Sequence, residues 1–156
     1  MPWFLSETKA PDFNLLDQNN NGISLDEFLG RRVILAFFPA AFTGVCTEEM
    51  CQFEQSPLCS VDSDVDVLGI CADSRFTNAA FAEKNGISFP ILSDYTRSTI
   101  ESYGVVLEDF AGMPGYTASE RAVFIVNELG VVMWKWIGEN PGAQPNYDDV
   151  LAASGE

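Results

Sequence analysis

The chain contains an uninterrupted apolar run from Val33 to Phe38 that ends at Pro39. The run combines β-branched and aromatic residues, which favour strands, and it places no polar residue on either side-chain face. A strand of this kind is buried on both faces, as in a sheet covered by helices on its two sides. A second, mostly apolar run extends from Val65 to Cys71. Together the two runs predict an α/β fold around a central sheet.

The remaining segments alternate between strand and helix patterns. Gly86 and Gly104 each follow a helical pattern and predict its end. The predicted helices cover residues 43–55, 77–85, 96–103 and 147–153, and further strands cover 87–92, 121–126 and 131–137. The sequence contains no internal repeat or linker. We therefore predict a single domain, residues 1–156, with a central mixed β-sheet flanked by helices.

A polar turn near the N-terminus lies between two short apolar segments, Phe13 to Leu16 and Ile23 to Leu25. Its Asn21-Gly22 pair is typical of a β-hairpin. The turn also resembles the start of a calcium-binding EF-hand loop, but the twelfth position, which requires a glutamate, is Phe28. We therefore expect an N-terminal β-hairpin and no metal at this turn.

The formal net charge of the chain is -15. A surface of this charge repels nucleic acid and anionic membranes, and we expect binding to neither. Adaptation to high salt is one explanation for the charge, and an ordinary acidic protein is the other. The longest apolar run is too short to cross a bilayer, and Met1 to Leu5 lacks the regions of a signal peptide. These features predict a cytoplasmic protein.

The four cysteines are Cys46, Cys51, Cys59 and Cys71. In a cytoplasmic protein they are not expected to form a structural disulfide framework. They form no C-x-x-C pair, and the chain has no histidine, so a zinc site would require unusual ligand spacing. We therefore expect no metal and no other cofactor, and we interpret the cysteines as catalytic or as buried thiols.

Cys46 lies at the predicted start of a helix, directly after the first buried strand. The free backbone N–H groups and the dipole of a helix N-terminus favour a thiolate. Thr43 places a hydroxyl three residues earlier, and the apolar segment from Pro39 to Phe42 can shield the sulfur from water. These features together predict a nucleophilic cysteine, and the alternative is an inert core residue.

The segment around Cys46 resembles the active-site signature of the peroxiredoxins, Pro-x3-Thr/Ser-x2-Cys, which Pro39, Thr43 and Cys46 match without gaps. The similarity covers nearly the whole chain, and the matching stretches follow one another in the order expected for the family. The further stretches that resemble the family are Thr47 to Glu49, Gly69 to Ser74, Phe89 to Asp94 and Arg121 to Val126.

This resemblance implies a thioredoxin-like fold and thiol peroxidase activity. The thiolate of Cys46 would attack a peroxide oxygen and become a sulfenic acid. Thr43 and the backbone N–H groups of Val45 and Cys46 would hold the peroxide. Arg121 would stabilise the thiolate and the developing charge, and Glu49 would orient the guanidinium.

The spacing of Cys46 and Cys51 resembles the bacterioferritin comigratory protein-like subgroup, in which the second position holds the resolving cysteine. In an intact helix these side chains point about 140° apart, so the first turns would have to unwind to form a disulfide. A thioredoxin-like donor would then reduce it. The C-terminal residues 145–153 instead resemble one-cysteine alkyl hydroperoxide reductase E-like proteins, in which an external low-molecular-weight thiol would act. Cys59 is a further candidate partner, whereas we expect Cys71 to be a core residue.

Two other classes of function remain open from the residues alone. A general thiol–disulfide oxidoreductase would normally carry C-x-x-C after the first buried strand, which this chain lacks. A binding module on the same fold could use Trp134 and Trp136, which share one face of a strand. Core or homodimer packing is the simpler interpretation of that pair.

Overall fold

The computed structural model describes residues 8–59 and 63–155. The N-terminal segment Met1 to Leu5, which we interpreted as lacking a signal peptide, lies outside these ranges. Among the described residues, no helix has the length and apolar character needed to span a membrane.

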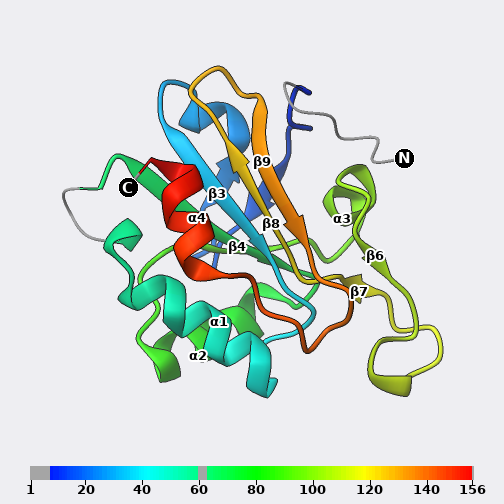
Figure 1. Ribbon diagram of the computed structural model, residues 1–156. Coiled ribbons are helices and arrows are strands. Elements are labelled where there is room, and N and C mark those ends of the chain that lie inside the picture. Colours follow the sequence, from blue (N-terminus) through cyan, green and yellow to red (C-terminus); the bar gives the residue numbers. More distant parts are fainter. Residues whose placement is uncertain (1–7, 60–62, 156) are drawn as a thin grey trace.

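A seven-stranded mixed sheet forms the centre of the fold (Figure 1). Its order is β2-β1-β5-β4-β3-β8-β9, and β3 pairs in parallel with β4 and antiparallel with β8. The strands are β1 Asn14–Leu16, β2 Gly22–Ser24, β3 Arg32–Phe37, β4 Val65–Cys71, β5 Ile91–Ser93, β8 Ala122–Val126 and β9 Val132–Ile137. The two apolar runs thus occupy adjacent positions inside the sheet, as their composition predicts.

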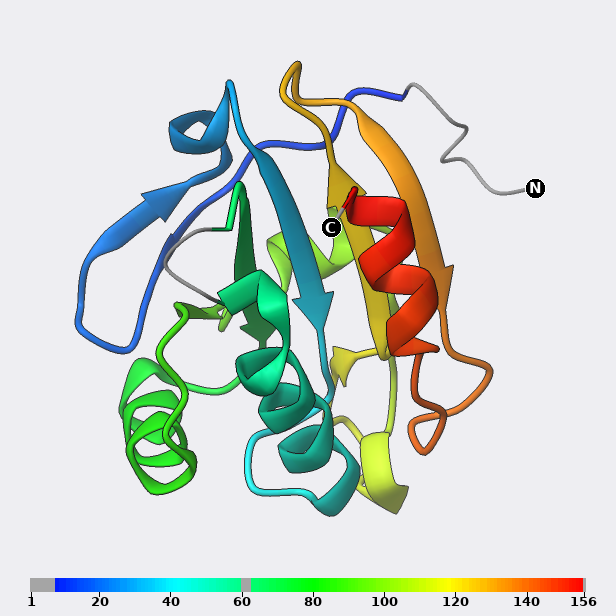
Figure 2. The same cartoon turned by 60° about the vertical axis from the view of Figure 1, so that its left-hand side comes forward.

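Helices cover both faces of this sheet (Figures 1 and 2). Helices α1 Gly44–Gln55, α2 Arg75–Asn85 and α4 Tyr147–Ser154 pack on one face, and the short α3 Ser98–Ser102 packs on the other. Three 3-10 turns, η1 Leu25–Phe28, η2 Pro57–Cys59 and η3 Phe110–Gly112, connect the larger elements. The predicted arrangement of a mixed sheet flanked by helices is confirmed.

The core has two halves because successive residues of a strand point to opposite faces. Ile34, Ala36 and Phe38 contact the side that holds α1, α2 and α4. Leu35 and Phe37 point to the α3 side, where the ring of Phe37 lies among other buried aromatic rings. Burying a side chain of this size contributes about 1.5–3 kcal/mol relative to leaving it exposed. This apolar support holds the end of β3 firmly in place.

The predicted N-terminal hairpin is present as β1 and β2, which pair antiparallel. In its turn, the carboxylate of Asp17 accepts hydrogen bonds from the backbone N–H groups of Asn19 and Asn21, both at 2.9 Å. The acidic side chain that resembled a calcium ligand therefore stabilises the turn itself.

Several predicted boundaries differ from the structure, and the physical reason is visible for two of them. Helix α2 begins at Arg75 rather than at residue 77, because the hydroxyl of Ser74 caps it by accepting from the backbone N–H of Thr77. Strand β5 begins at Ile91 rather than at residue 87, since Pro90 has no N–H with which to extend the ladder. A small two-stranded sheet of β6 Val106–Leu107 and β7 Ala118–Ser119 was not predicted.

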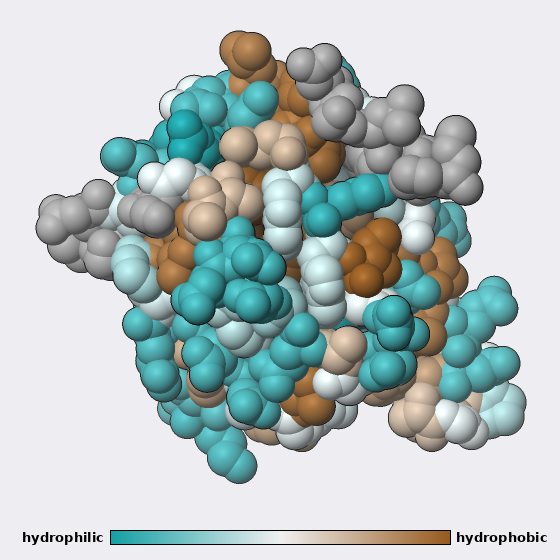
Figure 3. Space-filling model, viewed as in Figure 1, coloured by the Kyte–Doolittle hydropathy of each residue, from teal (hydrophilic) through white to brown (hydrophobic). Residues whose placement is uncertain are grey.

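The face that carries α1 and α4 is mostly hydrophilic, with apolar residues in separate patches (Figure 3). A surface of this kind agrees with the net charge of -15.

Candidate active site

The end of β3 and the beginning of α1 place Cys46 below the surface. Pro39 is buried two residues after the end of β3. Thr43 is the N-cap of α1, so Cys46 is the third residue of the helix. Its side chain is 0% exposed. The chain thus positions a thiol at a helix N-terminus, as the sequence predicts.

The sheet register brings Arg121 to this cysteine. Phe37 of β3 pairs with Ala122 of β8, so Arg121 lies beside the residue that follows β3. Side chains two residues apart on a strand share a face, and Val123 points to the α1 side of the sheet. Arg121 therefore points toward α1, although it lies 75 residues after Cys46.

The Arg121 guanidinium contacts three other residues. Its Nη2 donates to Sγ of Cys46 at 3.0 Å, and its Nη1 donates to Oε1 of Glu49 at 2.8 Å. Its Nε and Nη2 also donate to the carbonyl oxygen of Pro141, at 3.0 and 2.8 Å. Burial opposes the charge of Arg121, but the Glu49 carboxylate and the Cys46 sulfur outweigh that effect and raise its pKa. The group is therefore a permanent cation beside the sulfur.

Glu49 is fully buried one helical turn after Cys46. Its Oε2 has no hydrogen-bond partner among the residues that the structure describes. Burial raises the pKa of this carboxyl to about 7 from its usual 4.5, and the charge of Arg121 limits the rise. The same guanidinium also donates to the cysteine sulfur, so it links the Glu49 carboxyl to Cys46.

This carboxyl makes stability depend on pH. The folded protein binds the Glu49 proton more tightly than the unfolded chain, so the stabilising contribution is complete below about pH 4.5 and is lost as pH rises through about 7. We expect the free energy of unfolding of the wild type to fall more between pH 5 and pH 8 than that of Glu49→Gln. Urea denaturation at both pH values measures the difference, and an equal fall in the two proteins would contradict it.

The start of α1 also offers hydrogen-bond donors. The backbone N–H groups of Gly44, Val45 and Cys46 have no acceptor within the described ranges, as expected for the first turn of a helix. The hydroxyl of Thr43 is half-buried and donates to the carbonyl of Ala40 at 2.8 Å. Its oxygen can still accept a hydrogen bond from a ligand.

The loop before α1 has an additional support that the sequence analysis did not identify. The carboxylate of Asp73, after β4, accepts a hydrogen bond from the backbone N–H of Ala41 at 2.8 Å. The next residue, Phe42, has a φ of 68°, in the left-handed region that is unusual for a phenylalanine. Asp73 therefore helps to hold a strained loop beside the cysteine.

The other cysteines are apart from this contact network, and none of the four is in a disulfide. Cys51 is half-buried, and α1 is continuous from Gly44 to Gln55, so Cys46 and Cys51 point to different sides of an intact helix. Cys71 is buried and donates to Oδ1 of Asn78 at 3.3 Å, and burial raises its pKa well above the usual value.

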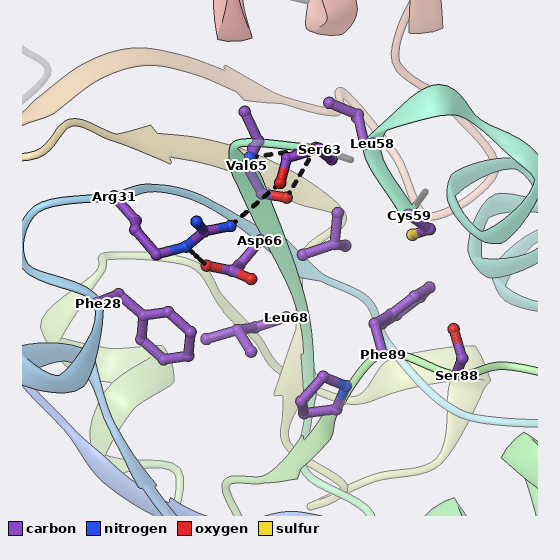
Figure 4. Close-up of a pocket in the computed structure, with 12 residues that line it drawn as sticks. Phe28, Arg31, Leu58, Cys59, Ser63, Val65, Asp66, Leu68, Ser88 and Phe89 are labelled. Carbon is purple, nitrogen blue, oxygen red and sulfur yellow. Dashed lines mark hydrogen bonds and ion pairs between the residues drawn. The ribbon is translucent and has the colours of Figure 1, made fainter. Parts of the chain in front are cut away.

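Cys59 lies near the opposite end of the central strands, on a cavity of about 300 Å³ (Figure 4). The cavity is bordered by the first residues of β4 and by an ion pair between Arg31 and Asp66, whereas Cys46 follows the other end of β3. Burial, with the nearby Glu54 carboxylate, raises the pKa of Cys59 to about 12. This thiol is therefore protonated at neutral pH.

The structure thus brings Arg121 into contact with Cys46 and Glu49, places Thr43 at the N-cap of the same helix, and leaves Cys51 on another side of α1. Pro39 is buried in the segment before this helix. Sequence reasoning missed Asp73 and Pro141 as contacts of the site. A main-chain carbonyl such as that of Pro141 leaves no mark in a sequence pattern, although Asn140-Pro141-Gly142 is a typical turn sequence.

The chain is similar to known proteins in sequence and in fold. The profile of the AhpC/TSA family matches residues 7–135. Two bacterial proteins whose names include the word peroxiredoxin are similar in sequence. One, from Mycobacterium tuberculosis, is 36% identical over 127 residues, which is 80% of each chain. The other, bcp from Coxiella burnetii, is 35% identical over 128 residues, covering 82% of this chain and 85% of that protein.

A solved structure shows the same fold. The crystal structure of peroxidoxin BcpB from Mycobacterium tuberculosis superposes with a TM-score of 0.80 at 27% identity, over 97% of this chain and 96% of that one. A thioredoxin-like sheet with a cysteine at the start of its first long helix defines a thiol-based redox enzyme. The chain belongs to the AhpC/TSA family of peroxiredoxins, and it is a thiol peroxidase.

Proposed function

We propose that Cys46 is the residue that reacts with peroxide. Its thiolate attacks one oxygen of a hydroperoxide, the O–O bond breaks, and Cys46 becomes a sulfenic acid. The other oxygen leaves with the bonding electron pair and takes up a proton from solvent, which gives water or an alcohol. The contact of 3.0 Å between Arg121 Nη2 and Cys46 Sγ is the observation that carries this proposal.

The surrounding groups support such a reaction. The guanidinium stabilises the thiolate before attack and the negative charge on the departing oxygen during it. Glu49 fixes the guanidinium from the other side by accepting from Nη1. The N–H groups of Val45 and Cys46, with the Thr43 hydroxyl, are close enough along the chain to hold the peroxide oxygens. Pro39 and its apolar neighbours limit access of water to the sulfur.

We propose that Cys51 resolves the sulfenic acid. The thiol of Cys51 attacks the sulfenic sulfur of Cys46, and a disulfide forms as water leaves. The helix must unwind locally to join the two residues, since a disulfide needs Cα atoms within about 7 Å and converging Cβ atoms. Cys59 and Cys71 are poorer candidates because burial raises the pKa of both thiols.

Mass spectrometry after one equivalent of hydrogen peroxide tests this assignment. The wild type is expected to lose two hydrogens through a Cys46–Cys51 disulfide, identified in its peptide map. The Cys51→Ser variant is expected to retain a sulfenic acid that dimedone traps. Cys59→Ser is the matched control and should still form the disulfide. A stable sulfenic acid without a disulfide in the wild type would instead identify a one-cysteine enzyme that an external thiol resolves.

We further propose that the enzyme acts in the cytoplasm, as a monomer or homodimer, and that a thioredoxin-like protein reduces its disulfide. A low-molecular-weight thiol is the donor in the one-cysteine case. The reductant is identified by comparing the rate of disulfide reduction by a thioredoxin with that by glutathione. A general thiol–disulfide oxidoreductase has less support, because the second cysteine follows after five residues rather than three.

A further inference from the structure

An exposed turn that connects β9 to α4 accepts hydrogen bonds from the guanidinium of Arg121. Residues Asn140 to Ala143 form this turn, in which the N–H of Ala143 donates to the carbonyl of Asn140 at 3.1 Å. The side-chain Oδ1 of Asn140 also accepts from the N–H of Gly142 at 2.9 Å. Pro141, between them, directs its carbonyl to the arginine.

This single carbonyl accepts two of the four hydrogen bonds that fix the guanidinium. The other two run to Cys46 and Glu49, both of which belong to α1. Arg121 is therefore held by two separate parts of the chain, one of which carries the reacting cysteine. The turn is also bound at its base, since the N–H of Gly138 donates to the carbonyl of Arg121 at 2.8 Å.

The position of the turn does not result from core packing. Asn140, Pro141 and Gly142 are exposed. A cavity of about 130 Å³ borders Asn140, Pro141 and Arg121. The turn also lies beyond residue 135, where the match to the family profile ends. The shape of the turn thus depends on its own hydrogen bonds. Asn140 accepts two of them, one through its carbonyl and one through its side chain.

We propose that the Asn140–Ala143 turn is a positioning element of the active site, which holds the Arg121 guanidinium against the Cys46 sulfur through the carbonyl of Pro141. The inference rests on the proposed role of Cys46 and adds to it a segment with no reactive side chain. A planar guanidinium with two of its N–H groups fixed has little freedom to swing away from the sulfur.

The same geometry gives the turn a role in recovery after each reaction. If the first turns of α1 unwind, the contacts of Arg121 with Cys46 and Glu49 are lost together. The contacts with Pro141 do not depend on that end of α1 and keep the guanidinium in place. When α1 refolds, Cys46 returns to an arginine that is already oriented.

The test compares Asn140→Ala with two matched variants. Asn140→Ala removes the acceptor for the Gly142 N–H and loosens the turn, whereas Asn140→Asp keeps an oxygen at that position. Asn127→Ala is the control for general destabilisation, because Oδ1 of Asn127 accepts from the N–H groups of Leu129 and Val131 in the turn at the far end of the same hairpin. Both turns thus lose the same kind of bond.

The readouts are the second-order rate constant for reaction with hydrogen peroxide, its pH profile, and the thiolate absorbance of the reduced protein. We expect Asn140→Ala to slow the peroxide step about tenfold to a hundredfold and to reduce the thiolate absorbance at neutral pH. Asn140→Asp should restore most of the rate, and Asn127→Ala should match the wild type. Melting temperatures verify that Asn140→Ala and Asn127→Ala are similarly folded.

Equal rates for Asn140→Ala and the wild type would overturn the inference. An equal loss of rate in Asn140→Ala and Asn127→Ala would also overturn it, as would a failure of Asn140→Asp to restore the rate. Cys46→Ser is measured in the same series. If Cys46→Ser still reduced peroxide, the proposed function itself would fail. If it were inactive while Asn140→Ala reacted normally, only the role of the turn would be refuted.

Discussion

Replacement of Cys46 by serine is expected to abolish peroxide consumption. The serine hydroxyl occupies nearly the same volume at the start of α1, so the fold and the Arg121 contact surface are retained. It does not ionise near neutral pH, however, and the thiolate is the form that attacks peroxide. Peroxide loss is measured with dithiothreitol as the electron donor, which makes the result independent of the natural reductant.

Cys59→Ser is the control for this substitution, because Cys59 lies near the opposite end of the central strands. It should consume peroxide at the wild-type rate. Turnover by Cys46→Ser above the rate of dithiothreitol alone would assign the reaction to another cysteine.

Replacement of Arg121 by alanine has the second largest expected effect, a slowing of the peroxide step by about 10²–10³-fold. The substitution removes the only side-chain donor that the structure places on the Cys46 sulfur among the described residues. Stopped-flow measurement of the reduced enzyme with hydrogen peroxide determines this rate. The thiolate absorbance at neutral pH should fall in parallel.

The alanine substitution also leaves Glu49 as a buried, unpaired carboxyl, and removal of one partner of a buried pair costs about 3–5 kcal/mol of stability. The double variant Arg121→Met with Glu49→Gln removes both charges and separates folding from catalysis. It should be folded and equally slow. Arg32→Ala is a second control, since Arg32 also donates to a backbone carbonyl but lies away from Cys46. A wild-type rate in the double variant would remove Arg121 from the mechanism.

The central sheet was predictable because its inner strands are unambiguous in the sequence. An apolar run such as Val33 to Phe38 can be buried only between two layers, and the structure places it next to the similar run from Val65 to Cys71. The predicted first residues of α2 and β5 were wrong by a few residues. The cap at Ser74 and the missing N–H of Pro90 determine where these two elements begin. The segment of β6, η3 and β7 has neither a long apolar run nor a helical period, so no prediction covered it.

The candidate site was predictable in part. Pro39, Thr43 and Cys46 lie within eight residues, so their relation is local and visible in the sequence. The proximity of Arg121 to Cys46 depends on the register between β3 and β8, which the residues alone do not define. Its assignment, like that of Glu49, came from the resemblance to peroxiredoxins. The contribution of Pro141 is a main-chain atom in a turn and could be found only in the structure.

The order of the chain has a consequence for protein synthesis. Cys46 precedes Arg121 by 75 residues, and Pro141 follows Arg121 after a further 20. Contacts of such long range form late, after the sheet has closed around β3 and β8. A nascent chain that has emerged from the ribosome only as far as β5 therefore carries Cys46 without the arginine that contacts its sulfur in the folded protein. In the proposed mechanism, Cys46 gains its activating contact only after β8 has been synthesised and has paired with β3.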